Sequence, residues 1–142
     1  MMISTKGRYA LRVMVDLAEH PTDAYIPLKE IAQRQEISEK YLESILKVLV
    51  RNGVLIGLRG KGGGYRLTKS PEKYTVGDIL EMMEELAPVS CLGKEAIQCP
   101  RMASCRTLPM WKKLDDMIHH FFHGITIADL AFSAQSGGDY VI

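Results

Sequence analysis

The stretch 28-LKEIAQRQEISEKYLESILKVLVRNGVLIGLRGKGGGYRLT-68 decides the fold. It begins with a short helical pattern over 28–34 and breaks at Glu36-Ile37-Ser38. It then continues with apolar residues at the spacing of a second helix: Tyr41, Leu42, Ile45, Leu46, Leu49 and Val50. Ser38 is a favoured N-cap, and Asn52-Gly53 is typical of a helix end. Two helices joined by so tight a turn have the size of a helix-turn-helix.

A β-hairpin is predicted directly after these helices. Its strands would be 54–58 and 64–68, and the loop 59-RGKGG-63 between them is glycine-rich and basic. Such a hairpin is the wing of a winged helix-turn-helix, whose second helix lies in the major groove. Lys40 can reach guanine or phosphate, and Arg59 can enter a narrow minor groove. The candidate DNA-binding residues are therefore Lys40, Tyr41, Glu43, Ser44, Arg59 and Lys61.

Helical spacing organises the rest of the chain. A first helix is predicted around Ala10–Ala18, capped by Ser4 or Thr5. A later one opens at Thr75 in a capping box with Asp78 and runs to Leu86. A long helix from about Leu108 to His123 carries one apolar face with Trp111, Leu114, Ile118, Phe121 and Phe122, and Thr126 caps a short terminal helix. An apolar stripe this long in a small chain indicates pairing with a second copy.

The expected fold class is mainly α: a winged helix-turn-helix with a small β-hairpin wing and a long C-terminal dimerisation helix. The division that follows is 1–86 for the DNA-binding domain, 87–107 for a cysteine-containing loop, 108–135 for the dimerisation and terminal helices, and 136–142 for a tail. The net charge also differs between the two halves of the chain. Residues 1–70 hold 12 basic and 7 acidic side chains, whereas residues 71–142 hold 6 and 10. A polyanion partner for the N-terminal half follows from this asymmetry, with a solvated charged face as the alternative.

All three cysteines, Cys91, Cys99 and Cys105, lie within 15 residues of each other. Thiolates so close together favour a shared soft metal or an iron–sulfur cluster. A zinc site is disfavoured because no CxxC pair is present, and a metal-free thiol switch is the stronger alternative. Three histidines at 119, 120 and 123 are better explained by the helix dipole or by solvation. His119 and His123 are nevertheless spaced to share a metal.

Several broad classes of protein are disfavoured. The chain has no signal-peptide pattern and no apolar run of about 18 residues, so a cytoplasmic protein without a membrane anchor is expected. No triad, phosphate loop or carboxylate pair occurs at usable spacing, which argues against an enzyme. An iron–sulfur carrier or enzyme subunit is the alternative from another class.

Three segments resemble the signature segments of the Rrf-two family of bacterial transcription regulators. They are 4-STKGRYA-10, 37-ISEKYL-42 and 59-RGKGGGY-65, and the resemblance extends from residue 1 to about 132. It implies a homodimeric winged-helix regulator, expected to be a repressor, that binds double-stranded DNA at an imperfectly palindromic operator. By the same resemblance, Lys40, Tyr41, Glu43 and Arg59 match DNA-contacting positions, although the position of Lys40 varies in the family.

The resemblance also implies an iron–sulfur cluster on Cys91, Cys99 and Cys105, with 4Fe–4S favoured over 2Fe–2S. Such a cluster would control operator affinity in response to iron, cluster status, or redox or nitrosative stress. The seven- and five-residue spacings are most similar to those of the rhizobial iron-sensing members. Leu108 and Arg8 stand where other relatives place a fourth ligand, so that ligand is unknown. A cluster-free regulator that senses thiol redox state or a partner is the alternative within the same fold.

Overall fold

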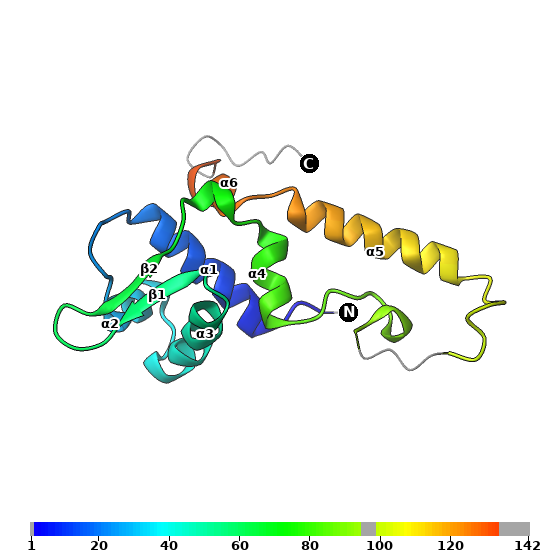
Figure 1. Ribbon diagram of the computed structural model, residues 1–142, viewed down its shortest axis with the longest axis horizontal. Coiled ribbons are helices and arrows are strands. Elements are labelled where there is room, and N and C mark those ends of the chain that lie inside the picture. Colours follow the sequence, from blue (N-terminus) through cyan, green and yellow to red (C-terminus); the bar gives the residue numbers. More distant parts are fainter. Residues whose placement is uncertain (1, 95–98, 134–142) are drawn as a thin grey trace.

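Helices make up most of the computed structural model, which describes residues 2–94 and 99–133 (Figure 1). The elements follow in the order α1 (Thr5–Glu19), α2 (Leu28–Gln35), α3 (Glu39–Arg51), β1 (Leu55–Leu58), β2 (Gly64–Leu67), α4 (Val76–Met83), α5 (Leu108–His123) and α6 (Ile127–Ser133). Short 3-10 turns lie at Pro71–Lys73 and Ser90–Leu92. The expected class, a mainly α winged helix-turn-helix with a small hairpin, is confirmed. None of the described helices combines the length and apolar character needed to cross a membrane.

Helix α1 is the central element of the winged-helix module, which comprises α1–α4 and the hairpin. It contacts α2, α3, α4, α6 and β2, and Ser4 caps it by accepting a hydrogen bond from the Gly7 amide at 2.9 Å. Its apolar stripe is buried against the matching stripe of α3, where Leu42, Ile45, Leu46 and Leu49 have no exposed surface. Burying each such side chain contributes roughly 1.5–3 kcal/mol, so this packing fixes the orientation of α3.

The turn between α2 and α3 is set by local hydrogen bonds. Glu36 adopts a left-handed conformation (φ 54°), which reverses the chain after α2. The Ile37 amide then donates to the Ala32 carbonyl at 3.1 Å. Ser38 starts α3 by accepting from the Tyr41 amide at 3.2 Å, as its sequence position predicts.

The wing is anchored by the segment that precedes α2. Strands β1 and β2 pair antiparallel, with Leu55 opposite Leu67 and Leu58 opposite Gly64. Ile26 and Tyr65 exchange two main-chain hydrogen bonds of 2.9 and 2.8 Å. Gly64 is needed at this contact, because its φ is 147° and a Cβ there would lie 2.2 Å from the Ile26 carbonyl oxygen. The backbone around Ile26 thus pairs with the hairpin at Tyr65 of β2 and attaches the wing to the rest of the module.

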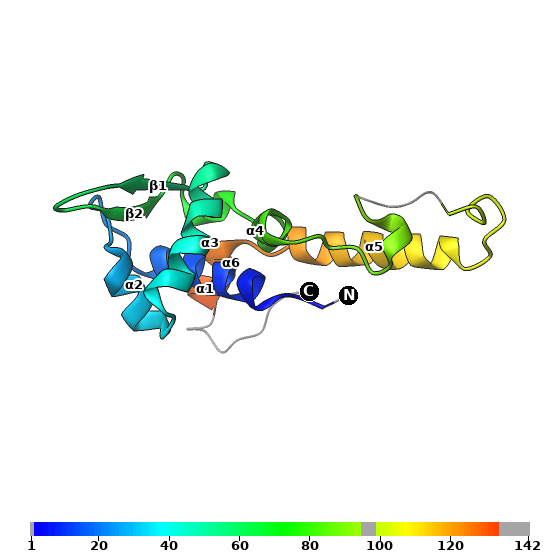
Figure 2. The same cartoon turned by 90° about the horizontal axis from the view of Figure 1, so that it is seen from below.

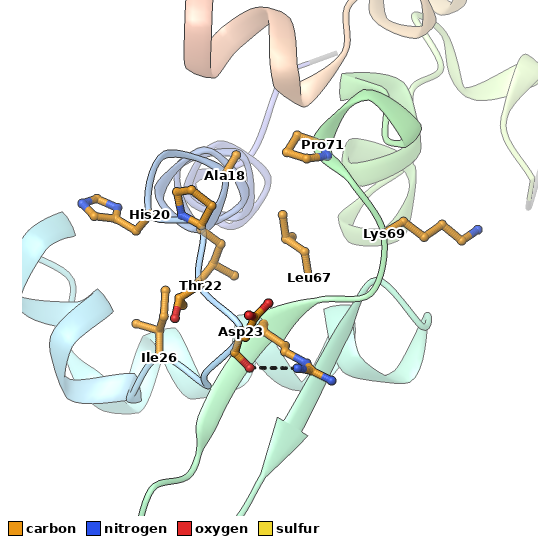
Figure 3. Close-up of a pocket in the computed structure, with 11 residues that line it drawn as sticks. Ala18, His20, Thr22, Asp23, Ile26, Leu67, Lys69 and Pro71 are labelled. Atoms are coloured by element: carbon orange, nitrogen blue, oxygen red, sulfur yellow. Dashed lines mark hydrogen bonds between the residues drawn. The ribbon is translucent and has the colours of Figure 1, made fainter.

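A side-chain contact strengthens the same attachment. The Arg66 guanidinium donates to the Asp23 carbonyl at 3.0 Å (Figure 3) and lies 4.9 Å from the centre of the Tyr25 ring. An open pocket of about 410 Å³ remains between this contact, the end of α1 and β2. Residues 47–69 contain six basic and no acidic side chains, and we call them the acid-free stretch. Although Arg66 belongs to this stretch, it stabilises the wing itself.

Helix α4 begins where the sequence predicts and ends earlier. Thr75 and Asp78 form the expected capping box, with bonds of 3.0 Å in both directions. The helix stops at Met83 instead of continuing to Leu86. Extended backbone at Glu84 lets its carboxylate accept from the Ser4 amide at the start of α1, at 2.9 and 3.0 Å. Leu86 is buried outside the helix, against Val76 and Leu80.

Helix α5 extends away from the winged-helix module, at the end opposite the hairpin (Figure 2). Its bounds match the predicted ones, but its apolar residues form two faces instead of one. Ile118 and Phe122 pack towards α4, whereas a second stripe is exposed: Met110, Leu114, Met117 and Phe121. After α5 the chain returns, and α6, capped by Thr126 and Asp129, packs on α1.

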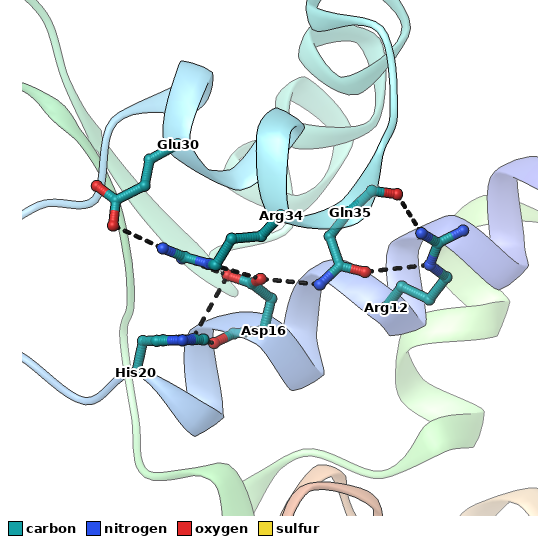
Figure 4. Close-up of polar contacts among 6 residues, drawn as sticks. All are labelled: Arg12, Asp16, His20, Glu30, Arg34 and Gln35. Carbon is teal, nitrogen blue, oxygen red and sulfur yellow. Dashed lines mark hydrogen bonds and ion pairs between the residues drawn. The ribbon is translucent and has the colours of Figure 1, made fainter.

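One buried charge links α1 to α2. Asp16 is 2 % exposed and accepts hydrogen bonds from the Arg34 guanidinium at 2.6 and 3.0 Å and from the Gln35 amide at 2.8 Å (Figure 4). Burial raises the pKa of Asp16, but the hydrogen bonds and charge of Arg34, with Gln35, outweigh it and lower the pKa overall. Glu30, on the exposed side of Arg34, completes the network at 2.6 Å.

We expect Asp16→Asn to lower the free energy of unfolding by about 1–3 kcal/mol, because it removes a buried acceptor that satisfies two donors. Since the pKa of Asp16 is lowered in the folded state, its contribution is present above the ordinary carboxyl pKa and is lost as the pH falls through the lowered value. Urea titrations at neutral pH and at about pH 3 would measure both effects. Glu30→Gln, at the exposed end of the network, should change stability by less than about 0.5 kcal/mol. Equal losses in the two variants would contradict the buried-pair interpretation.

Candidate nucleic-acid interface and cysteine segment

Helix α3 presents a continuous polar face to solvent. The four predicted residues on it, Lys40, Tyr41, Glu43 and Ser44, are all exposed. Ser44 donates to the Tyr41 carbonyl at 2.6 Å, and Glu43 lies 3.8 Å from Lys47, one turn further along the helix. The side chains that could reach base edges therefore lie together on the first turns of α3, held by local contacts that a DNA partner can replace.

Tyr41 is supported from α1. Its ring meets the Tyr9 ring edge-on, with centroids 5.9 Å apart, and the Arg12 guanidinium lies 4.9 Å from the centre of Tyr9. Arg12 also donates to the Gln35 side chain at 3.1 Å, which fixes it against the end of α2. This cluster orients an exposed aromatic ring at the N-terminal end of the reading helix.

The wing and α3 enclose a common groove. It measures about 860 Å³, and its walls are formed by Lys47 and Arg51 of α3, by Arg59 at the wing tip and by backbone of the glycine loop. Gly60 and Gly62 adopt positive φ values of 90° and 77°, which bring the loop back in a tight turn. Arg59 and Lys61 are exposed at its tip. A negatively charged, elongated partner could contact the helix and the wing together.

Lys47 and Arg51 belong to this groove although they were not among the predicted contact residues. The acid-free stretch that begins at Lys47 is the sequence signal that identifies them. Helical position alone would have placed them beyond the turns that face DNA.

The three cysteines lie on the segment between α4 and α5 (Figure 1). All three are free thiols and partly exposed, and Cys91 is in the short 3-10 turn. Their sulfur atoms do not form a cluster tight enough for a single ion in the described part of the chain. The segment therefore offers three soft donors on mostly irregular backbone, a set that suits a larger group such as an iron–sulfur cluster.

The thiol of Cys105 has hydrogen-bond partners at the start of α5. The Thr107 hydroxyl lies 3.4 Å from its sulfur. Hydrogen bonds from the Thr107 hydroxyl, then from the Thr107 and Leu108 amides, lower the pKa of Cys105, with a smaller effect of Arg101. These groups belong to the start of α5, so the thiolate is stabilised where the cysteine segment enters the helix.

The two positions considered for a fourth ligand contribute none. Leu108 is 8 % exposed and begins α5. Arg8 donates to the Thr5 hydroxyl at 3.0 Å on the surface of α1.

The ends of α4 and α5 that lie away from the cysteines are joined by main-chain hydrogen bonds. Val76 donates to the Ile125 carbonyl at 2.8 Å, and Ile127 donates to the Tyr74 carbonyl at 2.9 Å. In Figure 1, α4 and α5 form two sides of a triangle, and the described parts of the cysteine segment, 84–94 and 99–107, lie on the side opposite this junction.

Comparison with known proteins supports a regulator. The model of the Rrf2 family, described as "Iron-dependent Transcriptional regulator", matches residues 3–133. The protein rrf2 of Nitratidesulfovibrio vulgaris is 39% identical over 136 residues, covering 95% of this chain and 90% of that protein. The solved structure of T. potens IscR superposes with a TM-score of 0.75 at 33% identity, covering 99% of this chain and 93% of the other.

A second solved structure is named for a different signal. CymR, described as the global cysteine regulator of B. subtilis, superposes with a TM-score of 0.73 at 34% identity, over 98% of this chain and 99% of CymR. These relatives are regulators and not enzymes. With the winged-helix fold, the basic groove and the match along nearly the whole chain, they show that this protein is a DNA-binding transcription regulator of the Rrf2 family.

Proposed function

We propose that this protein is a homodimeric repressor whose affinity for DNA is set by an iron–sulfur cluster on Cys91, Cys99 and Cys105. The position of the cysteine segment carries the proposal, because that segment spans the open side between α4 and α5 while their other ends are hydrogen-bonded. A group bound there would favour one angle of α5 relative to the winged-helix module. Loading and loss of the group would then bias two arrangements of the dimer.

The donor set favours a cluster of the 4Fe–4S type, with 2Fe–2S as the alternative. Three free, partly exposed thiols can bind three irons as thiolates, and the apolar Leu108 and the surface Arg8 leave one iron to water or a small ligand. When bound, such a cluster would supply an iron that exchanges with the surroundings. This suits a sensor of iron supply, cluster status, or redox or nitrosative stress, and it agrees with the iron-dependent description of the family.

A metal-free thiol sensor is the second candidate. It is favoured by the hydrogen bonds that lower the pKa of Cys105 and by the similarity to CymR. In this version, oxidation of the thiols would change the shape of the same segment. In both versions the signal would change the conformation of the cysteine segment and the angle of α5. They differ only in whether a bound cluster or thiol oxidation causes the change.

The exposed stripe of α5 supports the homodimer. Met110, Leu114, Met117 and Phe121 are 37–60% exposed and lie on one helix face. Pairing this face with its copy about a two-fold axis would bury it and would place the two α3 helices to read half-sites about one DNA turn apart. We therefore propose that the operator is an imperfect palindrome, whose two half-sites match the two-fold symmetry of the dimer.

In the DNA complex, we assign base-edge contacts to Lys40, Tyr41, Glu43 and Ser44 at the start of α3. Arg59 and Lys61 of the wing would contact the minor groove and the backbone. Lys47 and Arg51, in the groove between them, would contact phosphates.

We expect Arg59→Ala to weaken binding to the operator by about 1–3 kcal/mol, because a wing-tip guanidinium loses its groove and phosphate contacts. Gel shifts on the DNA upstream of the protein's own gene, at two salt concentrations, would measure it. Lys69→Ala removes the same charge outside the α3–wing groove and should have a smaller effect. Equal affinities of the Arg59 variant and the parent would show that the wing does not read this DNA.

We expect Met117→Asp to convert dimers into monomers, because it places a charge in the centre of the exposed α5 stripe. Sedimentation analysis would report the change. Lys112→Asp, on the other side of the same helix, should leave the dimer intact. A parent chain that is monomeric at micromolar concentration would contradict the dimer proposal.

We expect anaerobic reconstitution with iron and sulfide to load about four of each per chain and to change operator affinity. Cys99→Ser should abolish loading, whereas Ser104→Ala, in the same segment, should not. Iron and sulfide analysis, absorbance and gel shifts on matched samples would test this. No uptake, with a DNA affinity that responds to oxidation, would replace the cluster by the thiol sensor. No uptake and no redox response would contradict both versions.

A further inference from the structure

A second group of metal-ligating side chains lies between α4 and α5 and includes none of the cysteines. Glu81 of α4 faces His119 and His123 of α5. Its Oε1 atom is 3.1 Å from Nδ1 of His119 and 2.8 Å from Nε2 of His123, and the three ligand atoms all lie within 4.8 Å of one another. Among the described residues, these three form the one group of at least three histidine, cysteine or acidic side chains whose ligand atoms are close enough to share a metal ion.

We propose that Glu81, His119 and His123 bind a divalent transition-metal ion, Zn²⁺ or Fe²⁺, that clamps α4 to α5. Two imidazoles and one carboxylate are a common ligand set for both ions, with the remaining positions open to water. The spacing is near what such an ion requires, because ligand atoms about 2.0–2.2 Å from one ion lie roughly 3–3.5 Å from each other. The site is independent of the thiols and goes beyond the proposed function.

The outer nitrogens of both histidines support a metal site. A ligating histidine usually donates its second ring N–H to a carboxylate or other acceptor, which orients the ring. Nδ1 of His123 lies 3.1 Å from the Thr75 hydroxyl and 3.6 Å from Asp78. Nε2 of His119 lies 3.4 Å from Asp115. A simple ion pair with Glu81 would not require a partner on the far side of each ring.

Packing also orients the two rings. They lie nearly parallel, at 10° and 6.3 Å between centroids, one helical turn apart. A Cβ at Gly77 would be 2.6 Å from the His123 ring, so glycine lets this ring lie directly on α4. The inner nitrogens thus point to Glu81 before any ion is bound, which lowers the ordering cost of binding.

Charge favours a cation at the same place. Glu81, Asp78 and Asp115 surround the imidazoles with three carboxylates. All the groups are between about one quarter and one half exposed, so an ion can enter from solvent. Sequence spacing identified the two histidines, but the third ligand, 38 residues before His119, is brought to them only by the fold.

The test uses the full chain with the three cysteines replaced by serine, so that no thiolate can bind metal. We expect Co²⁺ titration to show saturable binding of one ion per chain, with visible d–d bands and no sulfur charge-transfer band. Zn²⁺ and, under anaerobic conditions, Fe²⁺ should displace Co²⁺, whereas Mg²⁺ should not. Glu81→Gln and His119→Ala should each weaken binding more than about tenfold. His120→Ala, an exposed histidine of the same helix, should bind as the parent does.

Circular dichroism melting of each variant confirms that it is folded, and Zn²⁺ should raise the melting temperature of the parent and of His120→Ala only. No saturable binding would overturn the proposal. So would unchanged binding in Glu81→Gln, or displacement by Mg²⁺ as effective as that by Zn²⁺. Because neither DNA nor thiols take part, failure here would leave the proposed function intact.

Discussion

The main-chain hydrogen bonds that join residues 74–76 to 125–127 are the constraint on which the functional architecture depends. They hold the start of α4 against the end of α5, and they return the chain so that α6 can pack on α1. Side chains of α5 also pack on α4, whereas this junction joins the two helix ends through their backbone. The two helices therefore share one hydrogen-bonded corner, and the segment that carries the three cysteines lies on the opposite side.

Local signals in the sequence predicted most of the helix boundaries. Ser38 starts α3, Thr75 with Asp78 starts α4, and Thr126 with Asp129 starts α6, because a cap depends on residues three positions apart. The end of α4 could not be predicted in this way. The helix ends at Met83, three residues before the expected end, and the Glu84 carboxylate accepts from the Ser4 amide, 80 residues away, a contact that the local pattern does not reveal.

The candidate sites also differ in whether they depend on local sequence or on contacts between distant segments. Exposure of the α3 residues follows from helical periodicity, so the polar reading face could be read from spacing. The groove shared with the wing depends on the pairing of Ile26 with Tyr65, and the two apolar faces of α5 depend on where α4 lies. The convergence of Glu81 with two histidines is likewise a product of tertiary packing. Chemistry that resides in one segment is visible in sequence, and chemistry shared between segments is not.

The length of α5 determines how far its start would move if the helix rotated about the hydrogen-bonded junction at its end. A helix of 16 residues is about 24 Å long, so a pivot of about 10° at one end moves the other end by about 4 Å. The cysteine segment leads into the start of α5, whereas the junction with the winged-helix module is at the end of this helix. If a group binds at the cysteines as proposed, a shift of several ångströms in the loop backbone would therefore correspond to a rotation of α5 about the junction by only a small angle.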